Sequence, residues 1–85
     1  MNRARVFADV ATRNVRHLEE AVNHLSDARL SLSLAGESSA FEVGAQLTNA
    51  QKALERERNI AKRAAADADR IESKERLEAA TKETT

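Results

Sequence analysis

The stretch Leu34-Ala35-Gly36-Glu37-Ser38-Ser39-Ala40 decides the fold, because it holds the longest interruption of an otherwise helical pattern. Gly36 suits the left-handed backbone conformation that commonly follows the end of a helix. Ser39 followed by Glu42 fits a capping box, in which each side chain binds a backbone N–H of the first helical turn. The sequence therefore predicts two helices joined by a turn over 35–39. So short a connection predicts that the helices are antiparallel neighbours.

Both sides of the turn carry a mostly apolar row at alternating steps of three and four residues, which is typical of a coiled-coil seam. The first row comprises Ala4, Ala8, Ala11, Val15, Leu18, Val22, Leu25, Arg29 and Leu32. The second comprises Ala40, Val43, Leu47, Ala50, Leu54, Glu57, Ala61, Ala64, Ala68 and Ile71. We expect an all-α fold, a single hairpin domain over 1–85 with helices at about 3–34 and 40–78. Beyond about 78 the periodicity is lost, and we expect a frayed C-terminal tail.

Folding the chain at Gly36 places the large apolar residues of the two rows together in the half near the turn. In the other half alanines face alanines, which permits a close approach of the helices. The second helix is longer than the first and extends beyond its start, so Ile71 and Leu77 are expected to lack a partner within the chain. The predicted core of the hairpin or of an oligomer comprises Val15, Leu18, Val22, Leu25, Leu32, Leu47, Leu54, Ile60 and Ile71.

The composition favours assembly. The chain has 85 residues, of which seventeen are alanine, and it has no Cys that could form a disulfide. A small core with so few large side chains is near the limit of independent stability. A second apolar flank lies beside the two seams, on Phe7, Ala21, Ala28, Ala53 and Ile60. A hairpin buries one seam per helix, so this flank predicts a further layer, as in a helical bundle and a homo-oligomer. The alternative is that the alanines are helix formers on an exposed surface.

Charge is balanced overall but unevenly distributed. Residues 1–16 and 50–63 each carry a net charge of +3, whereas residues 17–49 carry −4. Like-charged pairs four residues apart, such as Lys52 and Arg56, disfavour the helix slightly and so suggest an anionic ligand or an acidic protein surface. The alternative is a solvated face neutralised by nearby carboxylates. The candidate contacts are the N-terminal apolar residues and the outward cations: Val6, Phe7, Val10, Arg13, Arg16, Lys52, Arg56, Arg63 and Arg70.

Several classes of function are disfavoured. The chain has two Phe and no Trp or Tyr, which leaves little for stacking on nucleic-acid bases. His17 and His24 are seven residues apart, too far for two ligands of one metal on a helix without further donors. The serines near the turn have no activating His within reach by sequence, so we expect no enzyme activity and no cofactor. No apolar run is long enough to cross a membrane, and the N-terminal residues do not resemble a secretory signal, so we expect a cytoplasmic protein.

The sequence leaves three hypotheses for the function. The favoured one is a non-catalytic protein–protein interaction module, a small oligomeric helical regulator, adaptor or inhibitor of a larger assembly. The second is an anion-binding bundle that recognises a nucleotide or nucleic-acid phosphate through converging Arg residues, with salt-dependent binding as its signature. The third is a coiled-coil structural subunit of a larger assembly.

Overall fold

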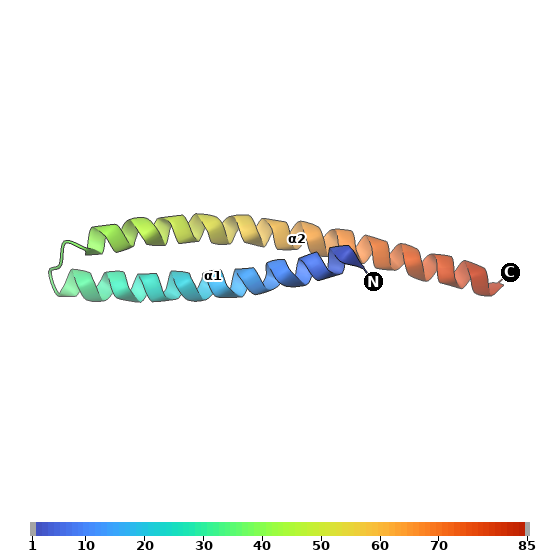
Figure 1. Ribbon diagram of the computed structural model, residues 1–85, viewed down its shortest axis with the longest axis horizontal. Helices are drawn as coiled ribbons and strands as arrows, with labels where there is room; N and C mark the ends of the chain where they lie inside the picture. Colours follow the sequence, from blue (N-terminus) through green and yellow to red (C-terminus); the bar gives the residue numbers. More distant parts are fainter. Residues whose placement is uncertain (1, 85) are drawn as a thin grey trace.

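The computed structural model describes residues 2–84, which form two helices, α1 over Arg3–Leu34 and α2 over Ala40–Thr84. The helices run antiparallel and pack against each other along α1 (Figure 1). The molecule is a rod with extents of 74 × 14 × 14 Å. The prediction of an all-α, two-helix hairpin is therefore confirmed.

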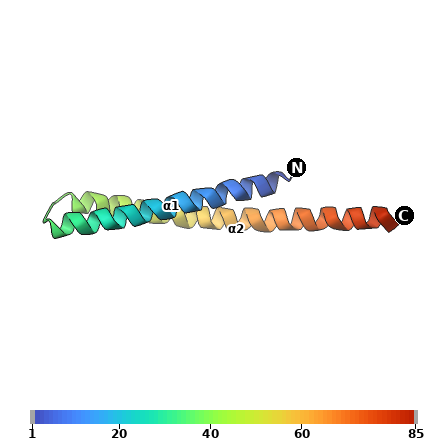
Figure 2. The same ribbon diagram turned by 90° about the horizontal axis from the view of Figure 1, so that it is seen from below.

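The two helices wrap around each other. Near the turn they are separated in the plane of Figure 1, whereas near the N-terminus they overlap there and are separated in the view turned by 90° (Figure 2). This gradual rotation keeps the two apolar rows in contact, since a repeat of 3.5 residues drifts around a straight helix of 3.6 residues per turn. The hairpin is thus coiled-coil-like in shape as well as in sequence pattern.

The end of α1 shows why Gly36 is required. Gly36 has a φ of +73°, and its N–H donates to the carbonyl oxygen of Ser33 at 3.0 Å. The N–H of Glu37 donates to the carbonyl oxygen of Leu32 at 2.9 Å. These two bonds make a Schellman motif, which satisfies carbonyl groups that the helix end would leave free. The predicted role of Gly36 is confirmed.

We expect the substitution Gly36→Ala to destabilise the hairpin by about 1–2 kcal/mol, because a Cβ disfavours the left-handed region. A Cβ built at this position meets nothing within 4 Å, so the cost is conformational and not steric. Urea unfolding followed by circular dichroism measures the effect. Gly36→Asn is the matched control and should cost less, since Asn tolerates positive φ better than Ala. Equal stability of the wild type and Gly36→Ala would contradict this account.

The start of α2 differs from the expectation. Within residues 2–84, neither Ser39 nor Glu42 forms the side-chain hydrogen bonds of a capping box, so that prediction is wrong. The N–H groups of Ala40 and Phe41 instead donate to turn carbonyl oxygens three residues earlier, at 3.2 and 3.1 Å. Because the turn backbone already satisfies these donors, the side chains have fewer groups left to cap.

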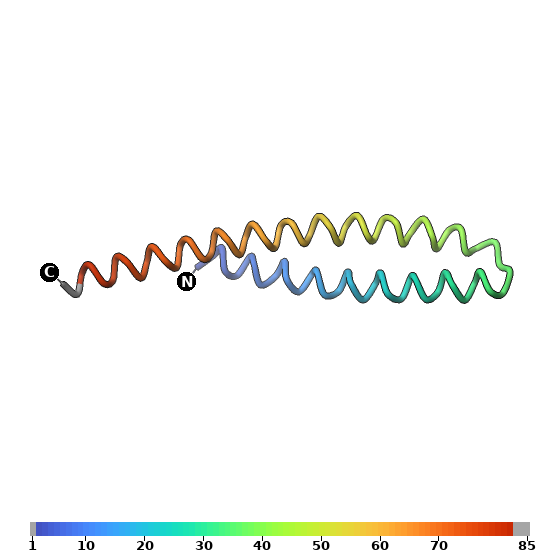
Figure 3. Tube along the Cα trace, turned by 180° about the vertical axis from the view of Figure 1, so that it is seen from behind, coloured from blue at the N-terminus to red at the C-terminus, as the bar shows by residue number. Residues whose placement is uncertain are grey.

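The far end of α2 also differs from the expectation. The sequence predicts an end near residue 78, whereas α2 continues to Thr84. Residues 79–83 contain no Gly or Pro, and good helix formers extend a helix without any apolar periodicity. The hydroxyl of Thr81 donates to the carbonyl oxygen of Leu77 at 2.9 Å, within the helix. Figure 3 shows α2 continuing well past the start of α1.

Candidate interaction surfaces

The most deeply buried side chains line the interface between α1 and α2. They are two leucines near the turn and four alanines in the other half: Leu47, Leu54, Ala8, Ala11, Ala64 and Ala68. Ala68 has no exposed surface, and Leu54 is 7% exposed. The four alanines are 0–5% exposed, so the alanine half of the interface excludes solvent as well as the leucine half does.

The predicted core is only partly enclosed by the hairpin. Leu47 and Leu54 are buried, and five of the nine predicted residues are half-buried: Val15, Leu18, Val22, Leu25 and Leu32. Ile60 and Ile71 are exposed within the single chain. Among the described residues no large side chain is completely buried. The rod therefore has a thin core.

Charged side chains join the helices along one side of the seam. Arg5 of α1 binds Asp69 at 2.5 Å and Glu72 at 2.9 Å, both in α2. Farther along, Glu19 of α1 lies 3.7 Å from Arg58 of α2. Arg5 and Glu19 are fourteen residues apart, and so are Arg58 and Glu72, which places each pair on one face of its helix. We call this side the polar flank and define it by these five residues.

The polar flank ends in a cluster that sequence patterns did not predict. Asn2 caps α1 by accepting a hydrogen bond from the N–H of Arg5 at 3.2 Å. Its side-chain amide donates to the carbonyl oxygen of Ala68 at 3.2 Å and thus ties the start of α1 to α2. The only signal in the sequence is an Asn directly before the first helical residue. The residues of α2 that Arg5 contacts, Asp69 and Glu72, are not part of the apolar rows, so the sequence pattern did not indicate them.

The charges of this cluster stabilise one another. The hydrogen bond from Arg5 lowers the pKa of Glu72 below its ordinary value, although partial desolvation opposes the shift. The hydrogen bonds of Arg5 with Glu72, and next with Asp69, raise the pKa of Arg5 further above its ordinary value. Arg5 therefore stays charged at every pH at which the protein would be studied. The stability that this cluster contributes is therefore lost at acidic pH, when Glu72 is protonated, and is unchanged at basic pH.

We expect Glu72→Gln to weaken the acid sensitivity of the fold. A carboxyl group with a pKa lower in the folded than in the unfolded state adds stability above its unfolded pKa, about 4.3. That stability is lost as the pH falls through the lower folded pKa. The wild type should therefore melt at a higher temperature than Glu72→Gln at pH 7, and the difference should shrink toward pH 3.

Thermal unfolding at one protein concentration, between pH 7 and pH 3, measures this difference. Glu78→Gln is the matched control, because Glu78 is an exposed residue of the same helix with no ion pair within the described part of the chain. Its melting temperature should follow that of the wild type at each pH. A Glu72→Gln difference that stays constant over the whole range would show that the charge of Glu72 does not stabilise the fold.

The opposite side of the seam carries apolar residues together with a few polar ones, but no charged pair between the helices within the described part of the chain. Phe7 and Ile60, two residues from Arg5 and Arg58 respectively, lie on the other side of their helices. Together with Arg63 they line a hollow of about 300 Å³ between α1 and α2. Phe7 is 58% exposed, and Val6 and Val10 beside it are also exposed. We call this side the Phe7 flank and define it by Phe7, Val10, Asn14, His17, Ala21, His24 and Ala28 of α1 with Ala53 and Ile60 of α2.

Most of the predicted anion-contacting cations lie on the surface as single charges. Among the described residues, five of the six form no ion pair: Arg13, Arg16, Lys52, Arg56 and Arg63. Arg70 instead pairs with Asp67 of the same helix. The five cations are exposed, and no hydrogen bond fixes their positions.

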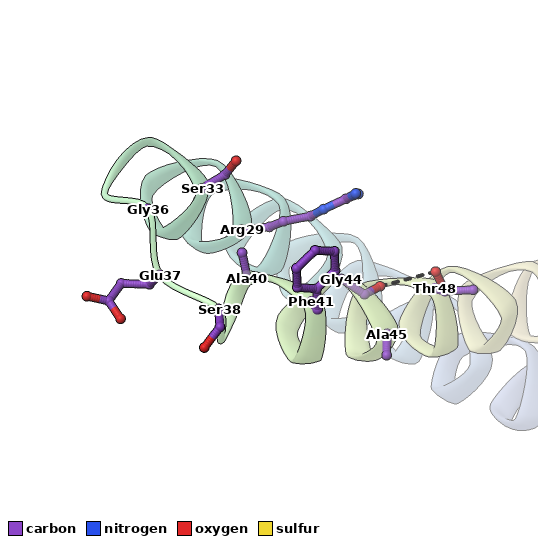
Figure 4. A pocket seen from close by; sticks show the side chains of 10 residues that line it. All are labelled: Arg29, Ser33, Gly36, Glu37, Ser38, Ala40, Phe41, Gly44, Ala45 and Thr48. Carbon is purple, nitrogen blue, oxygen red and sulfur yellow. Dashed lines mark hydrogen bonds between the residues drawn. The ribbon is translucent and has the colours of Figure 1, made fainter.

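Exposed apolar side chains and a hollow near the turn were not predicted. Phe41 is 85% exposed, and Leu30 and Leu34 are also exposed. Phe41 borders a hollow of about 650 Å³, over which Arg29 reaches from α1 toward α2 (Figure 4). A Cβ on Gly44 would lie 3.3 Å from Nε of Arg29, so this glycine makes room for the one cation in the first apolar row.

The described residues contain no group of three or more His, Cys, Asp and Glu side chains that could hold a metal ion. No helix within the described range is long and apolar enough to span a membrane. His17 and His24 are exposed on α1.

Comparison with known proteins identifies no relative. No protein-family model matches the chain, and no curated protein or solved structure matches it at a significant level.

Proposed function

We propose that the chain is a non-catalytic protein–protein interaction module, a small homo-oligomeric helical hairpin that acts as a regulator, adaptor or inhibitor of a larger assembly. One observation carries the proposal. Among the described residues, nine large apolar side chains are exposed, while no large side chain is completely buried. Four of them gather at the far end from the turn, namely Val6, Phe7, Val10 and Ile60, and such a cluster of exposed apolar side chains is typical of a binding surface.

The total surface supports the same proposal. The chain exposes 6741 Å², whereas a compact monomer of 9.3 kDa would expose about 5,000 Å². A specific interface removes about 800 Å² from each partner. The excess is therefore large enough for one partner, and a rod only 14 Å thick offers its long faces for that purpose.

The proposed contacts follow from the position of the exposed apolar residues. Val6, Phe7 and Val10 lie near the start of α1, where exposed Arg13 and Arg16 supply a polar rim. Interfaces of this kind combine an apolar centre with charged residues at the edge. Helix-against-helix packing would bury the apolar side chains, and charge complementarity would select the partner.

Molar mass measured by light scattering and sedimentation equilibrium, from nanomolar to micromolar concentrations, tests the self-association. We expect a dimer or a larger closed oligomer, with a melting temperature that rises with concentration. A strictly single-chain species that melts cooperatively at the same temperature throughout would overturn the proposal. A long open polymer would favour the alternative of a coiled-coil structural subunit.

A second candidate function rests on the five unpaired cations of the surface. An anion-binding bundle would bring Arg13, Arg16, Arg56 and Arg63 from two or more hairpins onto a nucleotide or nucleic-acid phosphate. Such binding weakens steeply with added salt. Titration with single-stranded RNA, duplex DNA and ATP at low salt tests this function, with Arg56→Glu and Arg63→Glu as variants. No binding at low salt would exclude it.

A further inference from the structure

We propose that a second copy of this chain packs on the Phe7 flank in antiparallel orientation, so that the turns lie at opposite ends of a four-helix bundle. The inference rests on the self-association in the proposed function and adds the partner, the face and the orientation. The polar flank is unsuited to this role, because its ion pairs between α1 and α2 already satisfy it.

The Phe7 flank repeats the spacing of a helix interface. Its seven residues on α1 follow alternating steps of three and four, and four of them are apolar, as in a coiled-coil seam interrupted by polar residues: Phe7, Val10, Ala21 and Ala28. The contact between α1 and α2 covers the other row, which contains the buried Ala8 and Ala11. A helix with two such rows side by side needs two neighbours, as in a four-helix bundle. The hairpin supplies one of them.

The sizes of the side chains favour the antiparallel orientation. The half away from the turn holds the bulky apolar members of the Phe7 flank: Phe7, Val10 and Ile60. The half near the turn holds Ala21, Ala28 and Ala53, together with His24. Antiparallel packing in the register given below places Val10 of one copy on Ala21 of the other and Phe7 on His24, so no bulky apolar side chain meets its own copy. Parallel packing would place bulky on bulky and leave gaps between the alanines.

The charges favour the same orientation. Residues 17–49, around the turn, carry a net charge of −4, while residues 1–16 and 50–63, farther from the turn, carry +3 each. In the contact between the two α1 helices, antiparallel packing lays residues 17–29, which carry a net charge of −2, on residues 2–14 of the other copy, which carry +2. Parallel packing would superimpose like charges. Complementary potentials of this kind favour association and fix its orientation.

The spacing also predicts a register. A two-fold axis perpendicular to the rod lays α1 of one copy on α1 of the second. The axis then passes between Asn14 and His17, so that Asn14 of each copy meets His17 of the other. The same register places Val10 of one copy beside Ala21 of the other. A polar pair in the middle of a mostly apolar seam is a known means of fixing register.

Disulfide trapping tests the arrangement, and the chain has no native Cys to interfere. Val10→Cys and Ala21→Cys are prepared as separate variants, then oxidised alone and as an equimolar mixture after subunit exchange. We expect covalent dimer in the mixture and none with either variant alone. In antiparallel copies the two identical positions are about 16 Å apart along the helix, too far for a disulfide. Ser26 is an exposed residue on the other side of α1. The control variant Ser26→Cys should not cross-link when it is mixed with Val10→Cys or with Ala21→Cys.

Each other outcome overturns a defined part of the inference. Covalent dimer formed by Val10→Cys alone would show parallel packing. Cross-linking through Ser26→Cys would show that a different face is used. A dimer by sedimentation that gives no cross-link between positions 10 and 21 would reject the arrangement and leave the self-association standing. A single-chain species by sedimentation would reject both this inference and the proposed function.

Discussion

The substitution Leu54→Ala is expected to unfold a large part of the protein at 25 °C. Leu54 is one of the two large buried side chains in the described part of the chain, with 7% of its surface exposed. Removing a buried leucine side chain costs about 2–5 kcal/mol, because both its burial and its contacts are lost. A single small core rarely supplies more than about 3–5 kcal/mol. The loss is therefore comparable with the whole stability of the hairpin.

Urea and thermal unfolding, followed by circular dichroism at one protein concentration, measure the effect. Leu77→Ala is the matched control, because it removes the same atoms from α2 at a position that is 70% exposed. It should change the unfolding midpoint little. If both variants shift the midpoint equally, then burial in the seam is not what holds the helices together.

The turn and the helix type could be predicted from the sequence because local signals determine them. Gly36 is one of two glycines in the chain, and its φ of +73° is the conformation that its position predicts. The two apolar rows specify which faces of the helices meet. Periodicity of this kind depends on the chain alone, and no competing signal opposes it here.

Details of the helix ends could not be predicted, because backbone groups compete with side chains there. The serines of the turn look like caps in sequence, but the carbonyl oxygens of Glu37 and Ser38 accept the first N–H groups of α2. α2 continues to Thr84 because its last residues are good helix formers, although they do not pack against α1. The apolar pattern shows only where a helix packs against another, so it could not predict this end. Helix propensity and apolar periodicity therefore give different ends for α2 in the part that extends beyond α1.

The candidate surfaces were predicted in part. The Phe7 side was identified from apolar residues next to the seam, and Phe7 and Ile60 indeed line one hollow. The Asn2 and Arg5 cluster was missed, because the sequence pattern does not indicate which residue of the other helix a charged side chain outside the seam will contact. The exposed Phe41 was missed for a related reason. An isolated aromatic residue at the start of a helix gives no periodic signal.

The depth of the alanine packing leads to the last expected result. Ala68 has no exposed surface and lies where Asn2 binds α2 at the start of α1. We expect Ala68→Leu to destabilise the hairpin by about 1–3 kcal/mol, because the added atoms force the helices apart. The same separation would break the hydrogen bond from Asn2 and lengthen the Arg5 ion pairs, so the pH-dependent stability from Glu72 should fall with it.

Ala66→Leu makes the same chemical change two residues away, at an exposed position of α2. It should leave the urea midpoint nearly unchanged, since both residues are good helix formers. If Ala68→Leu were as stable as Ala66→Leu, the helices would have to be far enough apart at this point to hold a leucine. The alanine half would then contribute little to the fold, and the hairpin would depend on Leu47, Leu54 and the half-buried apolar residues nearer the turn.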